Sequence, residues 1–377
     1  MDFSPTEAQA DLTALARRIL TDQATPDRLR KLEDGADRFD AELWSALAEA
    51  GVLAAALPES VGGSGLGLLE QCGVLIEIGR TVAPVPYFAS IAIAASALAR
   101  FADAGQLDRW VAPAAAGRLV LTAALEVSDE AGAPRAVPGP SGGWVLSGTA
   151  VAVPSGAIAD LFLVPAATPD GPIVLLVEAA DGGVTVQRQR MVDLDSAGQL
   201  ELAAVALPAD RVLGRAGQGA EVAGWLLARA TVGLCALQLG VTERALELTA
   251  EYARARVQFG RPIGGFQAVS QRLADGYVDV EAIRLTLWQA AWLLATGQPA
   301  DAEIATAKFW AADAGHRVAH TAVHVHGGVG LDVDHPLHRY FTAAKRYEFA
   351  LGGATEQLLR LGALLAANTG TPLPAEQ

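Results

Sequence analysis

Four residues at the end of a predicted long helix have the types and spacing that suit a phosphate-bearing ligand. Arg256, Gln258, Phe259 and Gly260 occur in the run Tyr-Ala-Arg-Ala-Arg-Val-Gln-Phe-Gly. A guanidinium offers a planar, permanently charged fork of donors, and a carboxamide placed beside it before a glycine turn suits a dinucleotide's pyrophosphate. Phe259 would add a flat apolar wall. The same residues also fit a basic helix end that complements its own dipole, and the short motif alone does not separate the two interpretations.

Three histidines, His316, His320 and His324, recur every four residues, so a helix would place them on one face. Such a set could bind zinc, but only Asp313 lies at a comparable spacing and no cysteine completes the set. We therefore expect no metal site, and buried or interface histidines instead.

The hydrophobic pattern that must position these residues divides the chain into three parts. Residues 1–115 carry helical patterns, interrupted by a glycine-rich turn at 62–67. Residues 116–218 carry short runs rich in Val and Leu, separated by Pro, Gly and Asp, which predicts a small β-domain. Residues 219–377 return to long helical patterns. We predict an α+β fold with an N-terminal α-helical domain, a middle β-domain and a C-terminal α-helical bundle.

The C-terminal part predicts five helices: 221–256, about 267–296, about 301–326, and two shorter ones after Pro336 and Ala350. At 1.5 Å per residue, the first of these would be on the order of 54 Å long. Such a length suits an oligomeric helical bundle more than a compact monomer.

Composition points to a cytoplasmic globular enzyme. The chain has 377 residues, 51% of them hydrophobic, but the sequence shows no unbroken apolar run of membrane-spanning length, and its first residues are acidic and polar. Two cysteines, Cys72 and Cys235, make no disulfide framework. The net charge of −14 argues against nucleic acid as a partner, and means that local Arg or Lys must hold any anionic ligand.

Six stretches, taken in order, resemble the acyl-CoA dehydrogenase family. They are 58–80 with its glycine-rich turn, 143–149, 206–214, the Arg256 segment, the His-Val-His-Gly-Gly-Val-Gly run from His324, and 339–345. The resemblance covers nearly the whole chain. It implies the family's fold, FAD as cofactor, and the family's reaction, in which a proton and a hydride leave adjacent carbons of an acyl-CoA thioester.

The resemblance also implies flavin-binding residues. In this family, Arg-x-Gln-Phe-Gly and Gln-x-x-Gly-Gly-x-Gly segments reach across a dimer interface to the FAD that is bound mainly by the neighbouring subunit. The positions that match these segments are Arg256, Gln258, Phe259, Gln267, His324, Gly327 and Gly328. His324 stands where the family usually has Gln, which keeps a hydrogen-bonding group but weakens the match at that residue.

Both positions at which family members carry the catalytic glutamate lack a carboxylate here. One position is Leu351, before Gly352, and the other is Ala230, on the long helix. The sequence therefore assigns no catalytic residue. Glu348 and Glu356 are the nearest acids to the first position, and either would have to be a relocated base.

Other departures affect the same half of the site. Ala228 and Thr231 occupy the positions at which the family holds the mouth of the CoA cleft. The family's Thr-Glu-Pro-x-x-Gly-Ser-Asp run is replaced at 125–132 by Leu-Glu-Val-Ser-Asp-Glu-Ala-Gly. The segment that lies against the flavin ring in the family is 152–155, where Pro154 has no N–H to donate.

Four hypotheses remain open on this basis. The first is one subunit of a heterotetrameric acyl-CoA dehydrogenase, whose homologous partner supplies the catalytic glutamate and the acyl-CoA cleft; its substrate would be a fatty acyl or steroid side-chain CoA, and its electron acceptor an electron-transfer flavoprotein. The second is a homotetrameric dehydrogenase with a relocated base. The third is a related flavin monooxygenase, and the fourth a scaffold without flavin.

Overall fold

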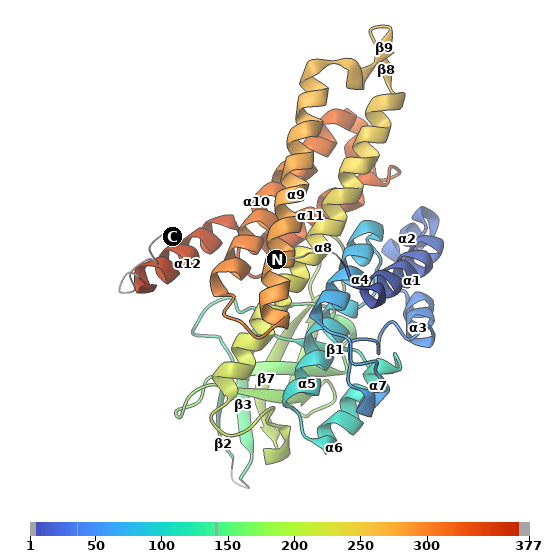
Figure 1. The fold of residues 1–377 in the computed structure, drawn as a ribbon. Coiled ribbons are helices and arrows are strands. Elements are labelled where there is room, and N and C mark those ends of the chain that lie inside the picture. The colour runs from blue at the N-terminus through green and yellow to red at the C-terminus, as the bar shows by residue number, and fades with distance from the viewer. Residues whose placement is uncertain (1–4, 36, 140–141, 369–377) are drawn as a thin grey trace. The chain divides into compact units, whose positions relative to one another are not determined.

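The computed structural model describes residues 5–35, 37–139 and 142–368, and the chain divides into two compact units, Met1–Gly233 and Leu234–Gln377 (Figure 1). Helices come first, then strands, then long helices, so the predicted α+β fold with a helical, a β and a second helical part is confirmed.

The first unit begins with helices whose starts are capped as the sequence would require. At α1, the Thr6 hydroxyl accepts from Gln9 N–H while the Gln9 side chain accepts from Thr6 N–H. Leu12, Ala16 and Leu20 form the buried stripe of the same helix. The helices are α1 (Glu7–Gln23), α2 (Pro26–Glu33), α3 (Ala41–Glu49), α4 (Leu68–Thr81), a π-helical segment (Tyr87–Ala95), α5 (Ser96–Phe101), α6 (Ala104–Gln106) and α7 (Ala112–Ala115).

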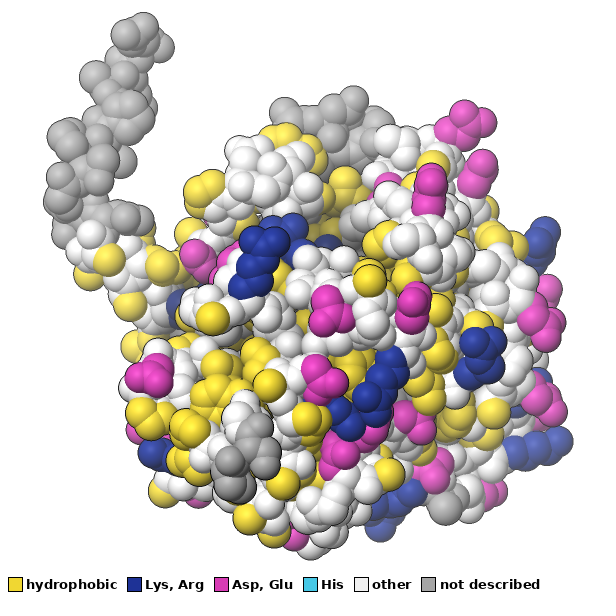
Figure 2. All heavy atoms as spheres, turned by 90° about the horizontal axis from the view of Figure 1, so that it is seen from below, with side chains coloured by type: hydrophobic (Ala, Val, Ile, Leu, Met, Phe, Trp, Pro, Cys, Tyr) yellow, Lys and Arg dark blue, Asp and Glu magenta, His cyan; other side chains and the backbone are white. Residues whose placement is uncertain are grey.

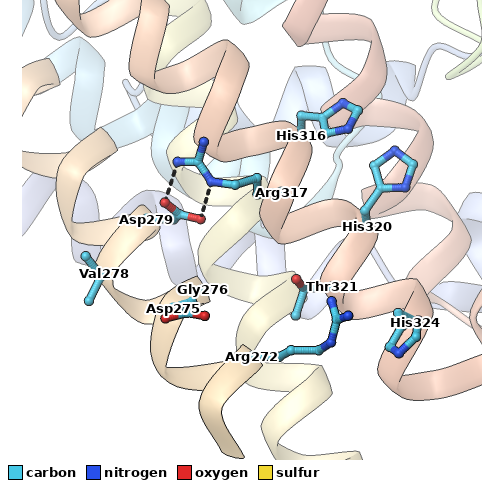
Figure 3. A pocket seen from close by; sticks show the side chains of 10 residues that line it. All are labelled: Arg272, Asp275, Gly276, Val278, Asp279, His316, Arg317, His320, Thr321 and His324. Carbon is cyan, nitrogen blue, oxygen red and sulfur yellow. Dashed lines mark hydrogen bonds and ion pairs between the residues drawn. The ribbon is translucent and has the colours of Figure 1, made fainter. Parts of the chain in front are cut away.

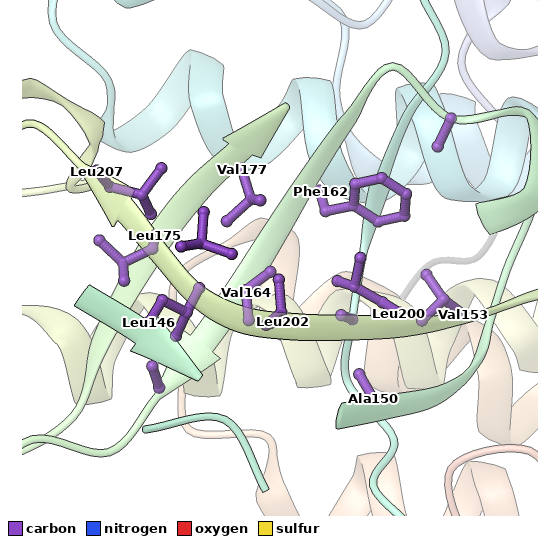
Figure 4. Packing of buried hydrophobic residues seen from close by; sticks show 14 of the residues in the cluster. Leu146, Ala150, Val153, Phe162, Val164, Leu175, Val177, Leu200, Leu202 and Leu207 are labelled. Carbon is purple, nitrogen blue, oxygen red and sulfur yellow. The ribbon is translucent and has the colours of Figure 1, made fainter. Parts of the chain in front are cut away.

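The strands of the first unit form two sheets, ordered β1-β4-β5 and β2-β3-β7-β6. β1 and β4 pair in parallel, whereas β4 with β5, β2 with β3, β3 with β7 and β7 with β6 pair antiparallel. The strands are β1 (Leu121–Ala123), β2 (Arg135–Pro138), β3 (Trp144–Val153), β4 (Leu161–Ala166), β5 (Ile173–Glu178), β6 (Val184–Arg188) and β7 (Gly198–Leu207). Leu146 and Leu200 of one sheet meet Phe162 and Leu175 of the other in a buried apolar core (Figure 4).

Helix α8 (Gly219–Ala255) runs from the first unit into the second. It is long and apolar enough to cross a membrane by length and composition, but 67% of its most apolar window is buried within the protein, as in a core helix. Four more helices complete the second unit: α9 (Gln267–Ala295), α10 (Asp301–His326), α11 (Leu337–Phe349) and α12 (Ala354–Asn368). These bounds confirm the five predicted C-terminal helices.

A buried amide fixes how three of these helices pack. The Gln238 side chain on α8 donates through Nε2 to the carbonyl of Ala311 on α10 (3.0 Å) and to that of Ala344 on α11 (3.3 Å). Gly315 makes room for it, since a Cβ there would lie 1.9 Å from Gln238 Nε2. The helix crossing therefore depends on a glycine facing a fully buried polar side chain.

Charges are mixed on the face of the molecule seen from below. Acidic and basic side chains alternate with apolar ones, and the described residues on this face form no continuous basic surface (Figure 2).

Candidate functional site

The tip of the α8–α9 hairpin carries the first predicted ligand-binding segment. Arg256 follows the last turn of α8, where its N–H donates to the Tyr252 carbonyl (2.8 Å), and a short ribbon of β8 (Val257–Gln258) and β9 (Arg261–Pro262) then reverses the chain. Phe259 and Gly260 turn it with φ of +53° and +80°. Phe259 is 93% exposed, so its ring faces solvent. Its left-handed φ is strained for a residue that carries a Cβ.

Gln267 begins α9 directly behind this tip. The preceding Phe266 meets the Phe259 ring edge to face at 6.1 Å, and the guanidinium of Arg261 lies over the Phe266 ring at 4.2 Å. These ring contacts hold the tip in shape. They keep the Phe259 side of the turn beside the start of α9, where Gln267 is exposed.

The second predicted segment lies where α10 ends. Gly327 ends the helix with φ of +66°, and neither Gly327 nor Gly328 has any atom within 4 Å of where a Cβ would stand. A ligand backbone or phosphate could therefore approach both glycines closely. Gly330 differs, because a Cβ there would lie 3.1 Å from His326 Cβ and from Val323 Cα. Its glycine serves packing.

Stacked rings bring the two segments together. The rings of Tyr252 on α8 and His326 on α10 stack with centroids 4.3 Å apart, and His326 Nδ1 lies 2.9 Å from the Ala322 carbonyl. Burial lowers the pKa of His326, which favours its neutral form. Arg256 is one turn beyond Tyr252, so the structure places the Arg256 and Gly327 segments at the same end of the bundle.

A groove between α9 and α10, which we call the α9–α10 groove, continues from this end along the two helices (Figure 3). Its volume is about 670 Å³. Arg272, Thr321 and His324 lie at one end, and His316 and His320 at the other (Figure 3). The remaining lining residues are Asp275, Gly276, Val278, Asp279 and Arg317.

Some charged side chains in the groove form ion pairs and others do not. Arg317 donates to both oxygens of Asp279, at 2.6 and 2.9 Å, so these two charges neutralise each other. Arg272 and Asp275 make no ion pair with another described residue. Burial, with the neighbouring His316 as the next cause, lowers the pKa of His320.

Glu348 and Glu356, the glutamates near Leu351, already bond to other groups of the chain. Lys345 Nζ lies 2.6 Å from Glu348 Oε2, and His316 Nδ1 lies 3.1 Å from Glu348 Oε1. Glu356 accepts from the Gly353 N–H at 2.7 Å, at the start of α12. One carboxylate is therefore held in an ion pair and the other caps a helix.

The two base positions themselves carry apolar side chains in the structure. Leu351 has φ of +55° and is followed by Gly352 at +93°, in the loop between α11 and α12. Ala230 is buried on α8. Neither side chain can accept a proton.

In the family that this chain resembles, the segment that matches 152–155 faces the flavin. Here, side chains of the same chain form hydrogen bonds with backbone groups of this segment. The Ala152 N–H donates to Gln189 Oε1 at 2.6 Å, and the Thr122 hydroxyl donates to the Pro154 carbonyl at 2.6 Å. Ala152 and Ser155 have φ of +50° and +53°, which bends the segment. The Ala152 N–H and the Pro154 carbonyl therefore already have partners, and Pro154 has no N–H to offer.

The stretch of α8 expected at a CoA mouth is likewise occupied. Thr231 donates to the Leu227 carbonyl of its own helix. Arg229 Nη2 lies 2.5 Å from Gln71 Oε1, and its guanidinium lies 4.9 Å from the centre of the Trp225 ring. Burial lowers the pKa of Arg229 to about 10, so it stays charged near neutral pH.

The seven predicted residues therefore divide into two groups that share one end of the second unit. Arg256, Gln258, Phe259 and Gln267 follow the hairpin tip, and the remaining three, His324, Gly327 and Gly328, follow the end of α10. Sequence reasoning missed Tyr252, Arg272 and Thr321, whose only signal was their helical spacing. In the part of the chain that the structure describes, no three His, Cys, Asp or Glu side chains come together to hold a metal ion.

A bundle end with an exposed Arg, an exposed aromatic ring and two open glycines has the chemistry to bind an extended anionic dinucleotide. The fold places the protein in the class of flavin-dependent acyl-CoA oxidoreductases. Residues 6–118 match the family model for the acyl-CoA dehydrogenase N-terminal domain, and residues 217–364 match that for the C-terminal domain. The chain belongs to the acyl-CoA dehydrogenase family, whose cofactor is FAD; one solved structure of the same fold is an FAD complex (25% identity, TM-score 0.88).

Three relatives are especially similar. Acyl-CoA dehydrogenase FadE27 of Mycobacterium tuberculosis is 52% identical over 374 residues, which cover 97% of this chain and 99% of that protein. A chain in the crystal structure of the ChsE4-ChsE5 complex from the same organism matches with a TM-score of 0.94 and 52% identity, covering 99% of this chain and 100% of that one. A chain of a Tcur3481-Tcur3483 steroid ACAD variant matches with a TM-score of 0.90 and 44% identity, covering 97% and 99%.

Proposed function

We propose that this chain is the flavin-supporting subunit of a heteromeric acyl-CoA dehydrogenase and that a homologous partner carries the catalytic glutamate. One contrast carries the proposal. The bundle end around Arg256 is exposed and open, whereas in the strand segment at 152–155 the Ala152 N–H is bonded to Gln189 and the Pro154 carbonyl to Thr122. A chain that keeps one half of a flavin site and fills the other suits a site shared with another subunit.

This chain's residues would act by binding and orienting. Arg256 would donate to the pyrophosphate, Phe259 would provide an apolar wall, and Gly327 and Gly328 would allow close approach of the cofactor. Arg272 at the near end of the α9–α10 groove would add a second cation. FAD, when bound, supplies the hydride acceptor of the family's reaction.

The partner would then hold the acyl thioester and remove its α-proton. Leu351 and Ala230 leave this chain without a base at either family position, and Glu348 is ion-paired with Lys345. This engagement of Glu348 favours a shared site over a homotetramer with a relocated base.

The relatives support the finer parts of the proposal. Two of the most similar structures support a shared site: one is of a ChsE4-ChsE5 complex, and the other is of a Tcur3481-Tcur3483 steroid ACAD variant. We therefore propose a heterotetramer, with an acyl-CoA bearing a bulky body such as a steroid as substrate, an electron-transfer flavoprotein as acceptor, and a cytoplasmic location. Cys72 and Cys235 are free and buried, which suits a reducing compartment.

The experiment that tests the proposal compares the chain purified alone with the chain co-expressed with a dehydrogenase paralogue encoded beside it. We expect stoichiometric FAD, seen by its visible absorbance, only in the co-expressed complex. Stoichiometric FAD together with acyl-CoA dehydrogenation in the chain alone would contradict the shared site. Colourless protein in both preparations would contradict any flavin role.

A further inference from the structure

Residues 327–336, which join α10 to α11 and which we call the glycine loop, pack against the buried side chain of His326. The Gly330 backbone lies so close that a Cβ there would be 3.1 Å from His326 Cβ. Farther along the loop, the His335 ring lies against the His326 ring, with centroids 5.1 Å apart. The Leu337 N–H donates to His335 Nδ1 at 3.3 Å, which ties this contact to the start of α11. Both halves of the glycine loop therefore depend on His326.

Another neighbour of the His326 ring belongs to the end of α8. The Tyr252 ring stacks on it with centroids 4.3 Å apart and planes 23° from parallel. The Tyr252 carbonyl in turn accepts from the Arg256 N–H at 2.8 Å. His326 thus connects both predicted flavin-binding segments, although it is only 4% exposed. Such a side chain can fix the distance between the segments without itself touching the cofactor.

The contacts of His326 suit a neutral ring. Its Nδ1 lies 2.9 Å from the Ala322 carbonyl, which can only accept, so Nδ1 carries a proton. A charged ring would need an acceptor for Nε2 as well, and the described residues offer no hydrogen bond there. In the part of the chain that the structure describes, no carboxylate forms an ion pair with His326 or His335. A proton on Nε2 of His326 therefore puts an unpaired charge at a buried site.

Titratable groups face the two rings from three elements: Tyr252 from α8, Asp332 from the glycine loop and His338 from α11. Burial lowers the pKa of His326, and the nearby His335 acts in the same direction, against one backbone hydrogen bond. Burial also lowers the pKa of His335, although Asp332 raises it. The closed loop therefore binds protons less readily than an open one. It is fully stable above the ordinary imidazole pKa of about 6.5 and loses stability as the pH falls through and below that value.

We propose that His326 is a positioning residue for the flavin, an inference that rests on the flavin-binding function proposed above. Its neutral ring, held between Tyr252 and His335, keeps the open glycines of the loop at the same end of the bundle as the Arg256 segment. When the ring gains a proton, the glycine loop opens and the affinity for FAD falls. The complex therefore retains its cofactor at neutral pH and releases it in mild acid.

The first test measures FAD affinity by titrating the deflavinated complex at about pH 8 and about pH 5.5, on either side of the range in which imidazoles titrate. His324 is exposed and predicted to contact the flavin, so its protonation would strengthen binding in acid. Every protein compared, the parent included, therefore carries His324→Gln. We expect this parent to bind FAD about tenfold more weakly in acid. His326→Phe, a neutral ring of similar volume, should bind within about threefold of the parent at the higher pH and lose most of the pH dependence.

The matched control is His320→Phe, on the same helix, whose ring contacts His316 and Phe341 instead of the glycine loop. It should keep the pH dependence of the parent. A parental pH dependence in His326→Phe overturns the proposal, and so does a parent with equal affinity at both pH values. If His326→Phe does not fold, His335→Phe takes its place, because it removes the second titrating ring. An undiminished pH dependence in that variant also overturns the proposal.

The second test follows the glycine loop itself, by hydrogen exchange in the complex without FAD. The Asp332 and His335 amides donate to carbonyls within the loop, at 3.2 and 3.0 Å, and exchange when it opens. We expect acid to lower their protection more in the parent than in His326→Phe, compared at the same pH. Equal protection in both proteins overturns the proposal. Acid-opened exchange in a complex that binds no FAD at either pH would instead contradict only the proposed flavin function.

Discussion

At the scale of single residues, Arg256 is the strongest candidate contact. Its neighbour Arg254 is also exposed and also lies at the end of α8, so the two arginines separate a ligand contact from a general helix-end charge. A charge near a helix end acts on the dipole wherever it lies in the last turn, whereas a pyrophosphate contact requires one particular guanidinium.

We therefore expect Arg256→Ala to weaken FAD binding to the complex by about tenfold to a hundredfold, since a hydrogen bond to a charged group contributes about 1.5–3 kcal/mol. Arg254→Ala, the matched control, should change it by less than about threefold. FAD affinity is measured by titrating the deflavinated complex. Gln258→Ala should give a smaller loss than Arg256→Ala because its hydrogen bonds are neutral. Equal losses in the Arg254 and Arg256 variants would favour the dipole interpretation.

Glu348 tests the other half of the hypothesis. Its carboxylate is bound by Lys345 and His316, so we expect Glu348→Gln to lower the melting temperature while turnover per bound flavin stays within about threefold. Glu356→Gln should also keep turnover, because an amide oxygen can still cap α12. Loss of a general base costs about 10²–10⁴-fold, so a drop of that size with flavin still bound would make Glu348 a relocated base.

At the scale of elements, the sequence predicts those whose pattern has a clear period. The helix predicted at 301–326 has the bounds of α10, and the short Val-rich runs became β3 to β6. The π-helical segment Tyr87–Ala95 was not predicted, since it is apolar at almost every position and therefore shows no period. The parallel pairing of β1 with β4 was missed as well, because it joins segments 40 residues apart (Leu121 with Leu161).

The crossing of α8, α10 and α11 gives a prediction about stability. Gly315→Ala should destabilise the protein by about 2–4 kcal/mol, because the new Cβ would displace the buried Gln238 amide from two carbonyls. Gly224→Ala on α8 is the control. It meets no atom within 4 Å and should stabilise by up to about 1 kcal/mol, since alanine favours helix. Urea unfolding followed by circular dichroism measures both; a Gly315→Ala variant as stable as the parent would show that Gln238 can repack.

At the scale of the whole molecule, the candidate site could be predicted only in part. The motifs around Arg256 and Gly327 are local in sequence, and the structure shows that the Tyr252–His326 stack brings them together. Arg272 and Thr321 became candidate site residues only once the structure showed the α9–α10 groove. The groove forms because two helices pack side by side, which the sequence does not show. Which residues touch the flavin stays a prediction, as do the domain boundaries at 115 and 218, although the chain divides into compact units at Gly233.

The last prediction concerns the whole molecule, because this chain lacks a catalytic base but keeps residues that could contact the flavin. Leu351→Glu returns a carboxylate to the family's base position, and Leu351 already has the left-handed φ that any replacement must adopt. We expect no new dehydrogenation in the chain alone, because the Ala152 N–H is still bonded to Gln189 and Pro154 has no N–H to donate to the flavin ring. In the complex, turnover should change by less than about twofold, whereas removal of the partner's glutamate should abolish it. Dehydrogenation of an acyl-CoA by the Leu351→Glu chain alone would show that the lost base was the only defect, and that the filled strand segment does not prevent flavin from binding.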